Sequence, residues 1–155
     1  MNITVRLAVP DDLGWLVSSQ ITMARESEGM KLDESTCRAG IEALIRDPSL
    51  GRYFIAETEA GAGARNRVGC VLLQREWSDW RNGWVGWIHS VFVEPSFRGK
   101  HVWASLYEWL KVDSARDPGF RGFRLYVDRG NHGARAVYQK LGMTCDHYEL
   151  YEWMK

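Results

Sequence analysis

Two segments near the start of the chain place apolar residues three and four positions apart, the period of a helix with one buried face. The first helix is expected after Pro10-Asp11-Asp12, and the second after Asp33, a favourable N-cap residue. The second helix should end before Asp47-Pro48, because the residue ahead of a proline disfavours helical angles. The predicted buried faces are Leu13, Leu16, Val17 and Ile21 in the first helix and Cys37, Ile41, Leu44 and Ile45 in the second.

Runs of β-branched and aromatic residues predict strands around and after these helices. Residues 61–66 are expected to form a short turn. Asn82-Gly83 is a strong hairpin signal, so the strands on either side of it should be antiparallel. The predicted strands cover residues 3–9, 53–57, 68–77, 84–93, 123–127 and 146–153.

Two further helices are predicted in the second half of the chain. Val102, Leu106, Trp109 and Leu110 share one helical face, and residues 135–141 form a short helix that closes at Leu141-Gly142. The order of elements predicts an α/β fold, a mixed sheet with helices on both faces. The helix between the fourth and fifth strands makes those strands parallel, and its N-terminus then lies at the carboxyl end of the fourth strand, where a ligand site is expected.

Composition narrows the possible functions. A length of 155 residues and a hydrophobic content of 45% suit one domain with a sizeable core. The 20 basic and 20 acidic residues create no overall field for nucleic acid or an anionic membrane, and no apolar stretch approaches the roughly 18 residues that span a bilayer. We therefore expect neither nucleic acid nor membrane as a partner.

The cysteines and histidines indicate no metal site. Cys37, Cys70 and Cys145 are odd in number and widely spaced, so we expect buried thiols in a reducing compartment. His101, His132 and His147 share no metal-ligand spacing with one another or with the cysteines. No charged leader with an apolar run is evident at the N-terminus, and we expect a cytoplasmic protein.

Two motifs carry the candidate chemistry. Residues 91–106 are predicted to be a buried strand that turns at Pro95 and enters a helix through Arg98 and Gly99, which directs free backbone N–H groups at an anion. Residues 131–143 are predicted to be a loop Asn131 leading a short helix whose last turn carries Tyr138. The first motif predicts an anion pocket.

Together these two segments resemble the GNAT family of N-acetyltransferases. In that family the first segment holds the pyrophosphate and pantetheine of acetyl-coenzyme A, and the second supplies an Asn, small residues and a Tyr beside the thioester. The resemblance implies a mostly antiparallel sheet with one splayed parallel strand pair, whose open main chain binds pantetheine. The cofactor-binding residues that it implies are Val91, Phe92, Val93, Arg98, Gly99, Lys100, His101, Val102, Trp103, Ala104, Asn131, Ala134 and Tyr138.

The phosphate loop departs from the family pattern at two positions. The usual pattern is Arg/Gln-x-x-Gly-x-Gly/Ala, and His101 and Trp103 stand where small residues are commonest. We expect ordinary right-handed angles here, in which case glycine serves close ligand approach and not backbone shape. His101 either adds a donor to phosphate or blocks it.

Acetyl transfer to an amine needs a base and an acid. An amine with a pKa near 10.4 is mostly protonated at neutral pH, so a base must take its proton, and the leaving thiolate must be quenched. The resemblance implies Tyr138 as the acid, although an aromatic residue there could simply pack the helix. His89 is the first candidate base and Glu76 the second; the alternatives are a hydrogen-bonded core histidine and a solvated hairpin residue.

Acceptor specificity is expected around the predicted hairpin and at the end of the first helix, at Glu28, Trp77, Asp79 and Trp80. Such a pocket suits an amine with a hydrophobic body, although hairpin tryptophans also form cross-strand pairs. We expect direct transfer from acetyl-coenzyme A to a small-molecule amine. A homodimer joined through the last strand is a further expectation, since an exposed edge strand needs cover. The alternatives are a non-catalytic acyl-coenzyme A-binding regulatory module, and acetylation of a protein N-terminus, a lysine or an aminoacyl-tRNA.

Overall fold

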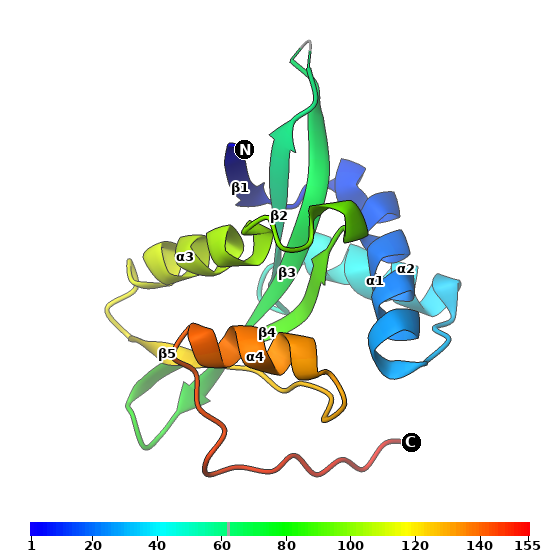
Figure 1. Ribbon diagram of the computed structural model, residues 1–155. Coiled ribbons are helices and arrows are strands. Elements are labelled where there is room, and N and C mark those ends of the chain that lie inside the picture. The colour runs from blue at the N-terminus through cyan, green and yellow to red at the C-terminus, as the bar shows by residue number, and fades with distance from the viewer. Residues whose placement is uncertain (62) are drawn as a thin grey trace.

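The computed structural model describes residues 1–61 and 63–155, and the turn predicted over residues 61–66 contains residue 62, which lies outside the described residues. Five strands form one sheet in the order β1-β2-β3-β4-β5 (Figure 1). The elements are β1 (Ile3–Leu7), η1 (Pro10–Asp12), α1 (Leu13–Glu28), α2 (Glu34–Arg46), β2 (Arg52–Glu59), β3 (Arg65–Ser78), β4 (Gly83–Val93), η2 (Pro95–Phe97), α3 (Val102–Ser114), β5 (Phe120–Arg124) and α4 (His132–Lys140).

The sheet is mixed, as predicted. β1, β2, β3 and β4 pair antiparallel in turn, and β4 pairs parallel with β5 across the α3 crossover. The β3–β4 hairpin has Asn82 at a φ of 44° in its loop and a Trp77–Trp84 pair close to that loop. The crossover places the start of α3 beyond the carboxyl end of β4 (Figure 1).

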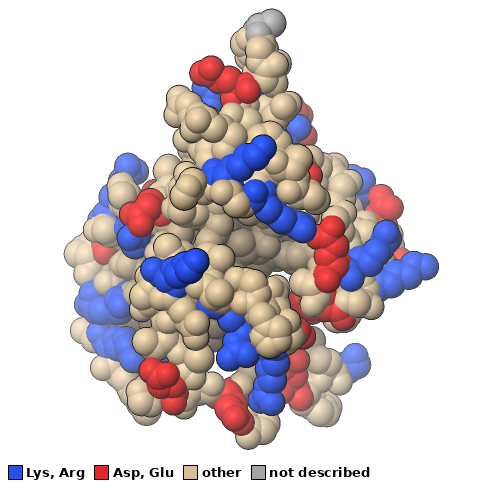
Figure 2. All heavy atoms as spheres, in the orientation of Figure 1, with Lys and Arg blue, Asp and Glu red and all other residues tan. Residues whose placement is uncertain are grey.

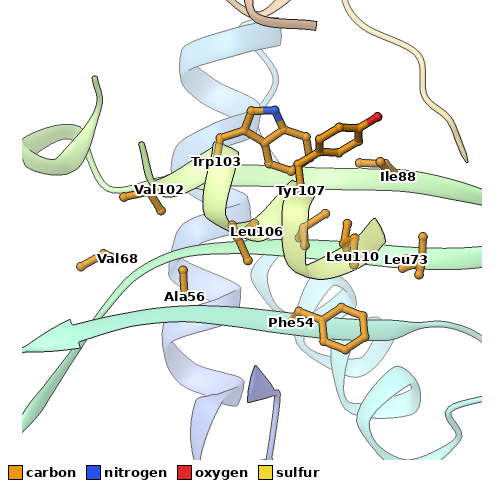
Figure 3. Packing of buried hydrophobic residues seen from close by; sticks show 11 residues of the cluster. Phe54, Ala56, Val68, Leu73, Ile88, Val102, Trp103, Leu106, Tyr107 and Leu110 are labelled. Carbon is orange, nitrogen blue, oxygen red and sulfur yellow. The ribbon is translucent and has the colours of Figure 1, made fainter. Parts of the chain in front are cut away.

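α3 packs on one face of the sheet (Figure 3). Its buried residues recur at helical spacing and meet the residues of β2, β3 and β4 that point to this face of the sheet. Tyr138 and Leu141 pack against the same cluster, so α4 lies on this side. The buried residues of the cluster are Phe54, Ala56, Val68, Val71, Leu73, Ile88, Val102, Trp103, Leu106, Tyr107 and Leu110.

α1 and α2 cover the opposite face. Leu16, Val17 and Ile41 are buried against Ile55 and Phe92 of the sheet. All of the residues that the sequence predicted for the buried faces of these two helices belong to this cluster, which confirms the predicted helical period. None of the helices in the described residues is long and apolar enough to cross a membrane.

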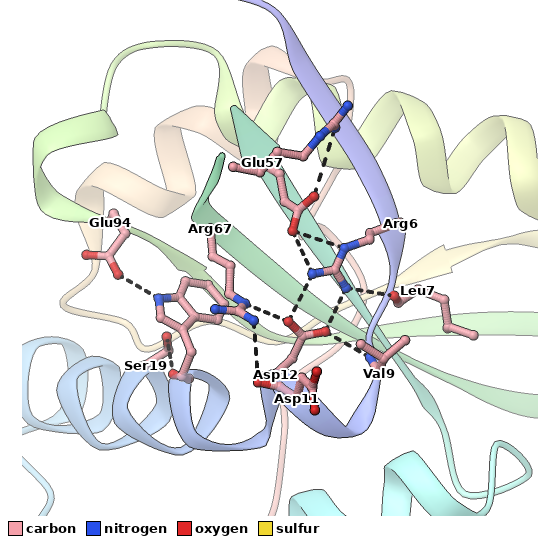
Figure 4. A network of polar contacts seen from close by, with 11 residues as sticks. Arg6, Leu7, Val9, Asp11, Asp12, Ser19, Glu57, Arg67 and Glu94 are labelled. Atoms are coloured by element: carbon pink, nitrogen blue, oxygen red, sulfur yellow. Dashed lines mark hydrogen bonds and ion pairs between the residues drawn. The ribbon is translucent and has the colours of Figure 1, made fainter. Parts of the chain in front are cut away.

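A buried ion cluster ties these elements together (Figure 4). Asp12 is fully buried at the start of α1 and accepts hydrogen bonds from Arg6 of β1, Arg67 of β3 and the Val9 N–H. Arg6 also donates to Glu57 of β2. Burial alone would raise the pKa of Asp12, but the hydrogen bonds from Arg6, Val9 and Arg67 outweigh it and lower that pKa to about 2. Asp12 is therefore an anion at neutral pH that connects the strands to α1 through Arg6 and Arg67.

Several predicted boundaries are displaced: β1 ends at Leu7 and not at residue 9, and β3 begins at Arg65, inside the predicted turn, and not at residue 68. β5 covers Phe120–Arg124 and not residues 123–127, because the Trp84 N–H bonds the Gly119 carbonyl and pairing starts there. α4 begins at His132, three residues earlier than predicted, because the Asn131 side chain caps it. The predicted close of this helix is confirmed by Gly142, at a φ of 82°.

The strand predicted over residues 146–153 is wrong. This segment has no regular structure and is exposed, with Tyr148, Tyr151 and Trp153 at the surface. It passes β5 closely enough for the Tyr148 ring to lie 5.6 Å from the Arg124 guanidinium, but it forms no backbone ladder with that short strand. A strand pattern without a paired edge is not stable as a strand. The burial predicted for the cysteines also fails at Cys145, which precedes this segment and is exposed.

Candidate active site

The parallel strands β4 and β5 separate part of the way along β4. Their last paired residues are Trp87 and Arg124, whereas β4 continues to Val93. A bulge follows, where Ser90 adopts a φ of 52° and two residues of β4 face one of β3. Along the described chain, no strand pairs with the β5-facing edge of β4 beyond Trp87, so main-chain groups of residues 91–93 on this edge are open to an extended ligand, apart from the Val93 carbonyl, which Arg98 occupies.

The loop between β4 and α3 presents backbone N–H groups at the same place. Gly99 has a φ of 74°, and a side chain built there would meet nothing within 4 Å. The Ser105 N–H makes the first bond of the helix, to the His101 carbonyl, at 3.0 Å. The N–H groups of residues 102–104 therefore precede the helical ladder and point at whatever lies ahead of α3.

The expectation of right-handed angles at His101 is wrong. His101 is the N-cap of α3 and has a φ of 64° and a ψ of 14°, which are left-handed. The chain must reverse from η2 into α3 within a few residues, and this turn sets the angle. Glycine is therefore favoured here on backbone grounds as well as for ligand approach, and His101 carries conformational strain.

Two cations flank this loop. Arg98 donates from Nε to the Val93 carbonyl at 3.1 Å and from Nη2 to the Glu26 carboxylate at 2.5 Å. The Lys100 Nζ lies 5.1 Å from the centre of the Phe97 ring. Glu26 lies in α1, and sequence spacing contained no signal that would pair it with Arg98.

α1 also contacts the start of the loop between β4 and α3. The Trp15 indole donates to the Glu94 carboxylate at 3.1 Å, and its ring packs edge-on against Phe92 at 6.2 Å. Glu94 is the residue that follows β4, so α1 fixes the point at which the chain leaves the sheet. This pair was also missed from the sequence, because Trp15 reads as one more apolar residue of a helix.

α4 brings Tyr138 to this region. Asn131 accepts the Ala134 N–H on its side-chain oxygen at 3.0 Å, which makes both residues parts of a helix cap. Tyr138 is partly buried, and its ring meets the Trp103 ring at 6.1 Å and 83°. Burial raises the pKa of Tyr138, so the phenol keeps its proton at neutral pH.

His89 lies on β4 just past the last pair with β5. Its ring stacks with Trp87 at 6.0 Å and 13° and meets the edge of Tyr126 at 5.4 Å. Desolvation lowers the pKa of His89 below its usual value of 6.5, so the imidazole is neutral at pH 7 and free to accept a proton. Tyr126 is a neighbour that the sequence did not indicate, because it follows the end of β5.

Glu76 is already engaged. Its two carboxylate oxygens accept from the Trp87 indole at 2.9 Å and from Arg124 at 3.1 Å. Both carboxylate oxygens of Glu76 are thus occupied by donors of its neighbours, whereas the imidazole of His89 has only aromatic contacts. The geometry favours His89 over Glu76 as the base.

The structure does not bring the predicted acceptor residues to Tyr138 and His89. Trp77 packs edge-on against Trp84 at 5.0 Å, the Asp79 side chain accepts the Trp80 N–H at 2.9 Å, and Trp80 is 84% exposed. These hairpin residues lie at the opposite end of β4 from the phosphate loop, and Glu28 is exposed at the end of α1. The hairpin tryptophans form the cross-strand pair that was the alternative interpretation.

The molecular surface is hollowed where these parts meet. Figure 2, drawn in the orientation of Figure 1, shows this hollow at the centre of the view, between the start of α3 and α4. Charged side chains of both signs lie on its rim. A separate open cavity of about 620 Å³ lies at the other end of α3, where Arg75 and Arg52 are paired with Asp117 and Asp113. Among the described residues, no group of three or more His, Cys, Asp or Glu side chains is placed to hold a metal ion.

Comparison with protein families gives one match that spans most of the chain. The model of the acetyltransferase (GNAT) family matches residues 16–143. A search of curated proteins returned no significant sequence match.

Solved structures share the whole fold. The chain is similar to a possible acetyltransferase from Clostridium difficile 630, with 34% identity, a TM-score of 0.87, and coverage of 100% of this chain and 99% of that one. It is also similar to AAC(6')-Iy in complex with the bisubstrate analogue CoA-S-monomethyl-acetylneamine, at 16% identity, a TM-score of 0.79, and coverage of 100% and 99%. A predicted acetyltransferase with acetyl-CoA from Clostridium acetobutylicum matches at 20% identity, a TM-score of 0.76, and coverage of 99% and 96%. The last two likenesses concern the fold alone.

Proposed function

Because this chain belongs to the acetyltransferase (GNAT) family, we propose that it transfers acetyl directly from acetyl-coenzyme A to the amine of a small molecule. One observation carries the proposal: the open edge of β4, the free N–H groups of α3 and the Tyr138 phenol all border one region. An extended amide-containing arm, a diphosphate and a thioester match these three features in turn.

The residues present suit acetyl-coenzyme A. The main chain of residues 91–93 would hydrogen-bond the pantetheine amides as an added strand does. The N–H groups of residues 102–104, with Arg98 and Lys100 nearby, would hold the pyrophosphate. The open space above Gly99 lets a phosphate approach the main chain closely.

His89 and Tyr138 would handle the protons. Acetyl-coenzyme A supplies an acetyl group activated as a thioester. Neutral His89 accepts a proton from the ammonium group of the acceptor, and the resulting amine forms the new C–N bond while the C–S bond breaks. The departing thiolate takes the proton of the Tyr138 phenol, the second proton of the attacking nitrogen passes to the Tyr138 phenolate and leaves a neutral amide, and His89 releases its proton to solvent. Cys70 adjoins β4 but is fully buried, and burial raises the pKa of its thiol, which supports direct transfer without an acyl-enzyme.

A small-molecule acceptor is favoured by the surroundings of His89. Trp87 and Tyr126 place aromatic rings on two sides of the imidazole, a lining that suits a compact organic amine. The fold is shared with AAC(6')-Iy, whose structure holds a bisubstrate analogue built on acetylneamine. Balanced charge counts against an aminoacyl-tRNA, and a peptide amine remains the alternative acceptor.

One observation supports a second candidate function, a non-catalytic module that binds acyl-coenzyme A. His101 is strained and Trp103 is bulky, at the two positions where the family favours small residues. Such a module would bind acetyl-coenzyme A without turnover of any amine.

Cellular location and assembly belong to the same proposal. Three free cysteines suit the reducing cytoplasm. The exposed Tyr148, Tyr151, Trp153 and Met154 suit a homodimer in which a second copy covers the C-terminal segment. Sedimentation of the full chain and of a chain ending at Met143 tests the dimer. We expect the full chain to sediment as a dimer and the shortened chain as a monomer. A full chain that sediments as a monomer would exclude this surface.

Calorimetric titration with acetyl-coenzyme A, coenzyme A and dephospho-coenzyme A tests the proposed function. We expect micromolar binding of acetyl-coenzyme A, about −8 kcal/mol, and then release of free thiol when an amine library is added. Trp80→Ala, at an exposed hairpin position, is the matched control and should bind equally well. Absence of binding would overturn the proposal, and binding without thiol release from any amine would favour the non-catalytic module.

A further inference from the structure

We propose that the indole N–H of Trp103 donates a hydrogen bond to a pantetheine carbonyl of acyl-coenzyme A, so that this residue holds the cofactor by its side chain. The inference rests on the proposed function, because it assumes that the hollow beside α3 takes this cofactor. It concerns an atom that the main-chain phosphate loop does not involve.

The Trp103 Nε1 is an orphaned donor. Trp103 is 9% exposed, and among the described residues its Nε1 is the buried side-chain nitrogen or oxygen that has no hydrogen-bond partner. A buried N–H without an acceptor loses its bond to water and gains nothing in return, so such groups are rare and call for a partner. A ligand oxygen at this point would supply that partner at the moment of binding.

Packing prevents Trp103 from finding a partner within the protein. Its ring meets Tyr107 at 5.8 Å and 37° and Tyr138 at 6.1 Å and 83°. Figure 3 shows the indole lying along α3 with its nitrogen on the side away from the sheet. The ring therefore packs against two tyrosines, and its N–H lies on the side of α3 that faces away from the sheet.

The position of the ring identifies the part of the cofactor. Trp103 starts in the first turn of α3, where the free N–H groups suit the pyrophosphate, and its ring reaches Tyr138, the candidate acid beside the thioester. The indole thus spans the stretch between these two groups, and in coenzyme A that stretch is the pantetheine arm with its amide carbonyls. A neutral N–H is the appropriate donor for an amide oxygen.

Other buried or half-buried tryptophans of the chain show what a satisfied indole looks like here. The Nε1 of Trp15 donates to Glu94, and that of Trp87 donates to Glu76. Among the residues that the structure describes, none provides such an acceptor to Trp103. The bulky residue at a position where the family favours glycine or alanine is then a replacement binding group and not an obstruction.

Trp103→Phe tests the inference, because it keeps an aromatic ring and removes the N–H. We expect the Kd for acetyl-coenzyme A to rise about five- to twenty-fold, while the urea midpoint of the free protein stays the same or rises, since an unpaired buried donor has been removed. A purely structural Trp103 would instead lower the midpoint and leave the affinity of the folded fraction unchanged. Trp109→Phe, on the same helix and packed 4.6 Å from Phe54, is the control and should leave the Kd unchanged.

Two further measurements make every outcome decisive. In the wild-type protein the indole N–H resonance of Trp103 should move downfield on titration with acetyl-coenzyme A, and an unmoved resonance overturns the inference even if Trp103→Phe fails to fold. S-acetylpantetheine is an acetyl donor that lacks the phosphates. Trp103→Phe should lower kcat/KM by the same factor for this donor as for acetyl-coenzyme A. A loss seen only with acetyl-coenzyme A would place the hydrogen bond on a phosphate and overturn the pantetheine assignment. If the wild-type protein and Trp103→Phe bind acetyl-coenzyme A equally well, the inference is rejected and the proposed function stands. If the wild-type protein does not bind acetyl-coenzyme A, the proposed function is rejected as well.

Discussion

The Glu26 carboxylate of α1 lies 2.5 Å from the guanidinium of Arg98 in the loop ahead of α3. Both side chains are about half exposed, so the pair is a surface ion pair that contributes little to stability. Its importance is positional, because Arg98 is one of the two cations beside the expected pyrophosphate. A bound phosphate and Glu26 would compete for the same guanidinium.

Glu26→Gln should therefore strengthen coenzyme A binding by about two- to five-fold, since an exposed ion pair is worth roughly 0.2–1 kcal/mol. The gain should shrink as salt is raised, because salt screens exposed charges. Calorimetric titration at two ionic strengths measures both effects. Glu28→Gln, at the exposed end of the same helix, is the control, and weaker binding by Glu26→Gln would show instead that Glu26 orients Arg98.

His101→Gly should stabilise the free protein by up to about 1 kcal/mol. A non-glycine residue pays roughly 1–2 kcal/mol for left-handed angles, while glycine loses about 0.5–1 kcal/mol through its greater freedom when unfolded. Urea unfolding at pH 7 measures the difference. His132→Gly, in the first turn of α4 with no such angle, should be destabilising, and equal losses in both variants would contradict the strain at His101.

Asp12→Asn should cost about 2 kcal/mol of unfolding free energy, because it removes the fully buried carboxylate that accepts charged hydrogen bonds from the partly exposed Arg6 and Arg67. The hydrogen bonds that hold the pKa of Asp12 at about 2 contribute stability above the usual pKa of 3.8, and this stability is lost as the pH falls toward 2. Urea unfolding between pH 7 and pH 2 should show a shallower acid loss in the variant. Asp146→Asn, at an exposed position, should unfold like the wild type at every pH.

Local features of the fold could be predicted from the sequence, whereas features that depend on distant segments could not. The helical faces around Leu16 and Ile41 and the β3–β4 hairpin follow from local spacing, and the structure confirms them. The strand predicted over residues 146–153 also has a local pattern, but a strand exists only if a paired edge is available. Apolar alternation alone carries no information about that edge.

The candidate site shows the same limit. The motif at Arg98 and Gly99 indicates where an anion binds, because helix starts have this property wherever they occur. The contacts that tune the site, Glu26 with Arg98 and Trp103 with Tyr138, join segments far apart in the chain and have no sequence pattern. The left-handed angle of His101 was missed because it depends on the path of the chain into α3.

His89→Gln should remove the acidic limb of the kcat/KM profile. Desolvation lowers the pKa of His89, so in the wild type this limb should lie below the usual value of 6.5. The same shift makes the protein less stable as the pH falls below about 6.5, because the unfolded chain binds a proton that the folded chain resists. This fall should be smaller in His89→Gln and unaltered in His147→Gln, at an exposed position. A limb that persists in His89→Gln would indicate that the acceptor amine or Glu76 titrates instead.

Tyr138→Phe separates chemistry from packing at the other proton site. The phenol is the candidate donor to the leaving thiolate, so its loss should lower kcat by about 100-fold or more, the usual contribution of a positioned acid. The ring remains to pack against Trp103, and the Kd for acetyl-coenzyme A should change by less than about two-fold. Burial raises the pKa of Tyr138, so the wild-type rate should show no basic limb from this group below about pH 10.

Tyr107→Phe, on the other side of Trp103 and 8% exposed, is the matched control and should keep full turnover. If Tyr138→Phe also keeps full turnover, the proton on the thiolate comes from solvent, and Tyr138 serves only to fix the indole of Trp103.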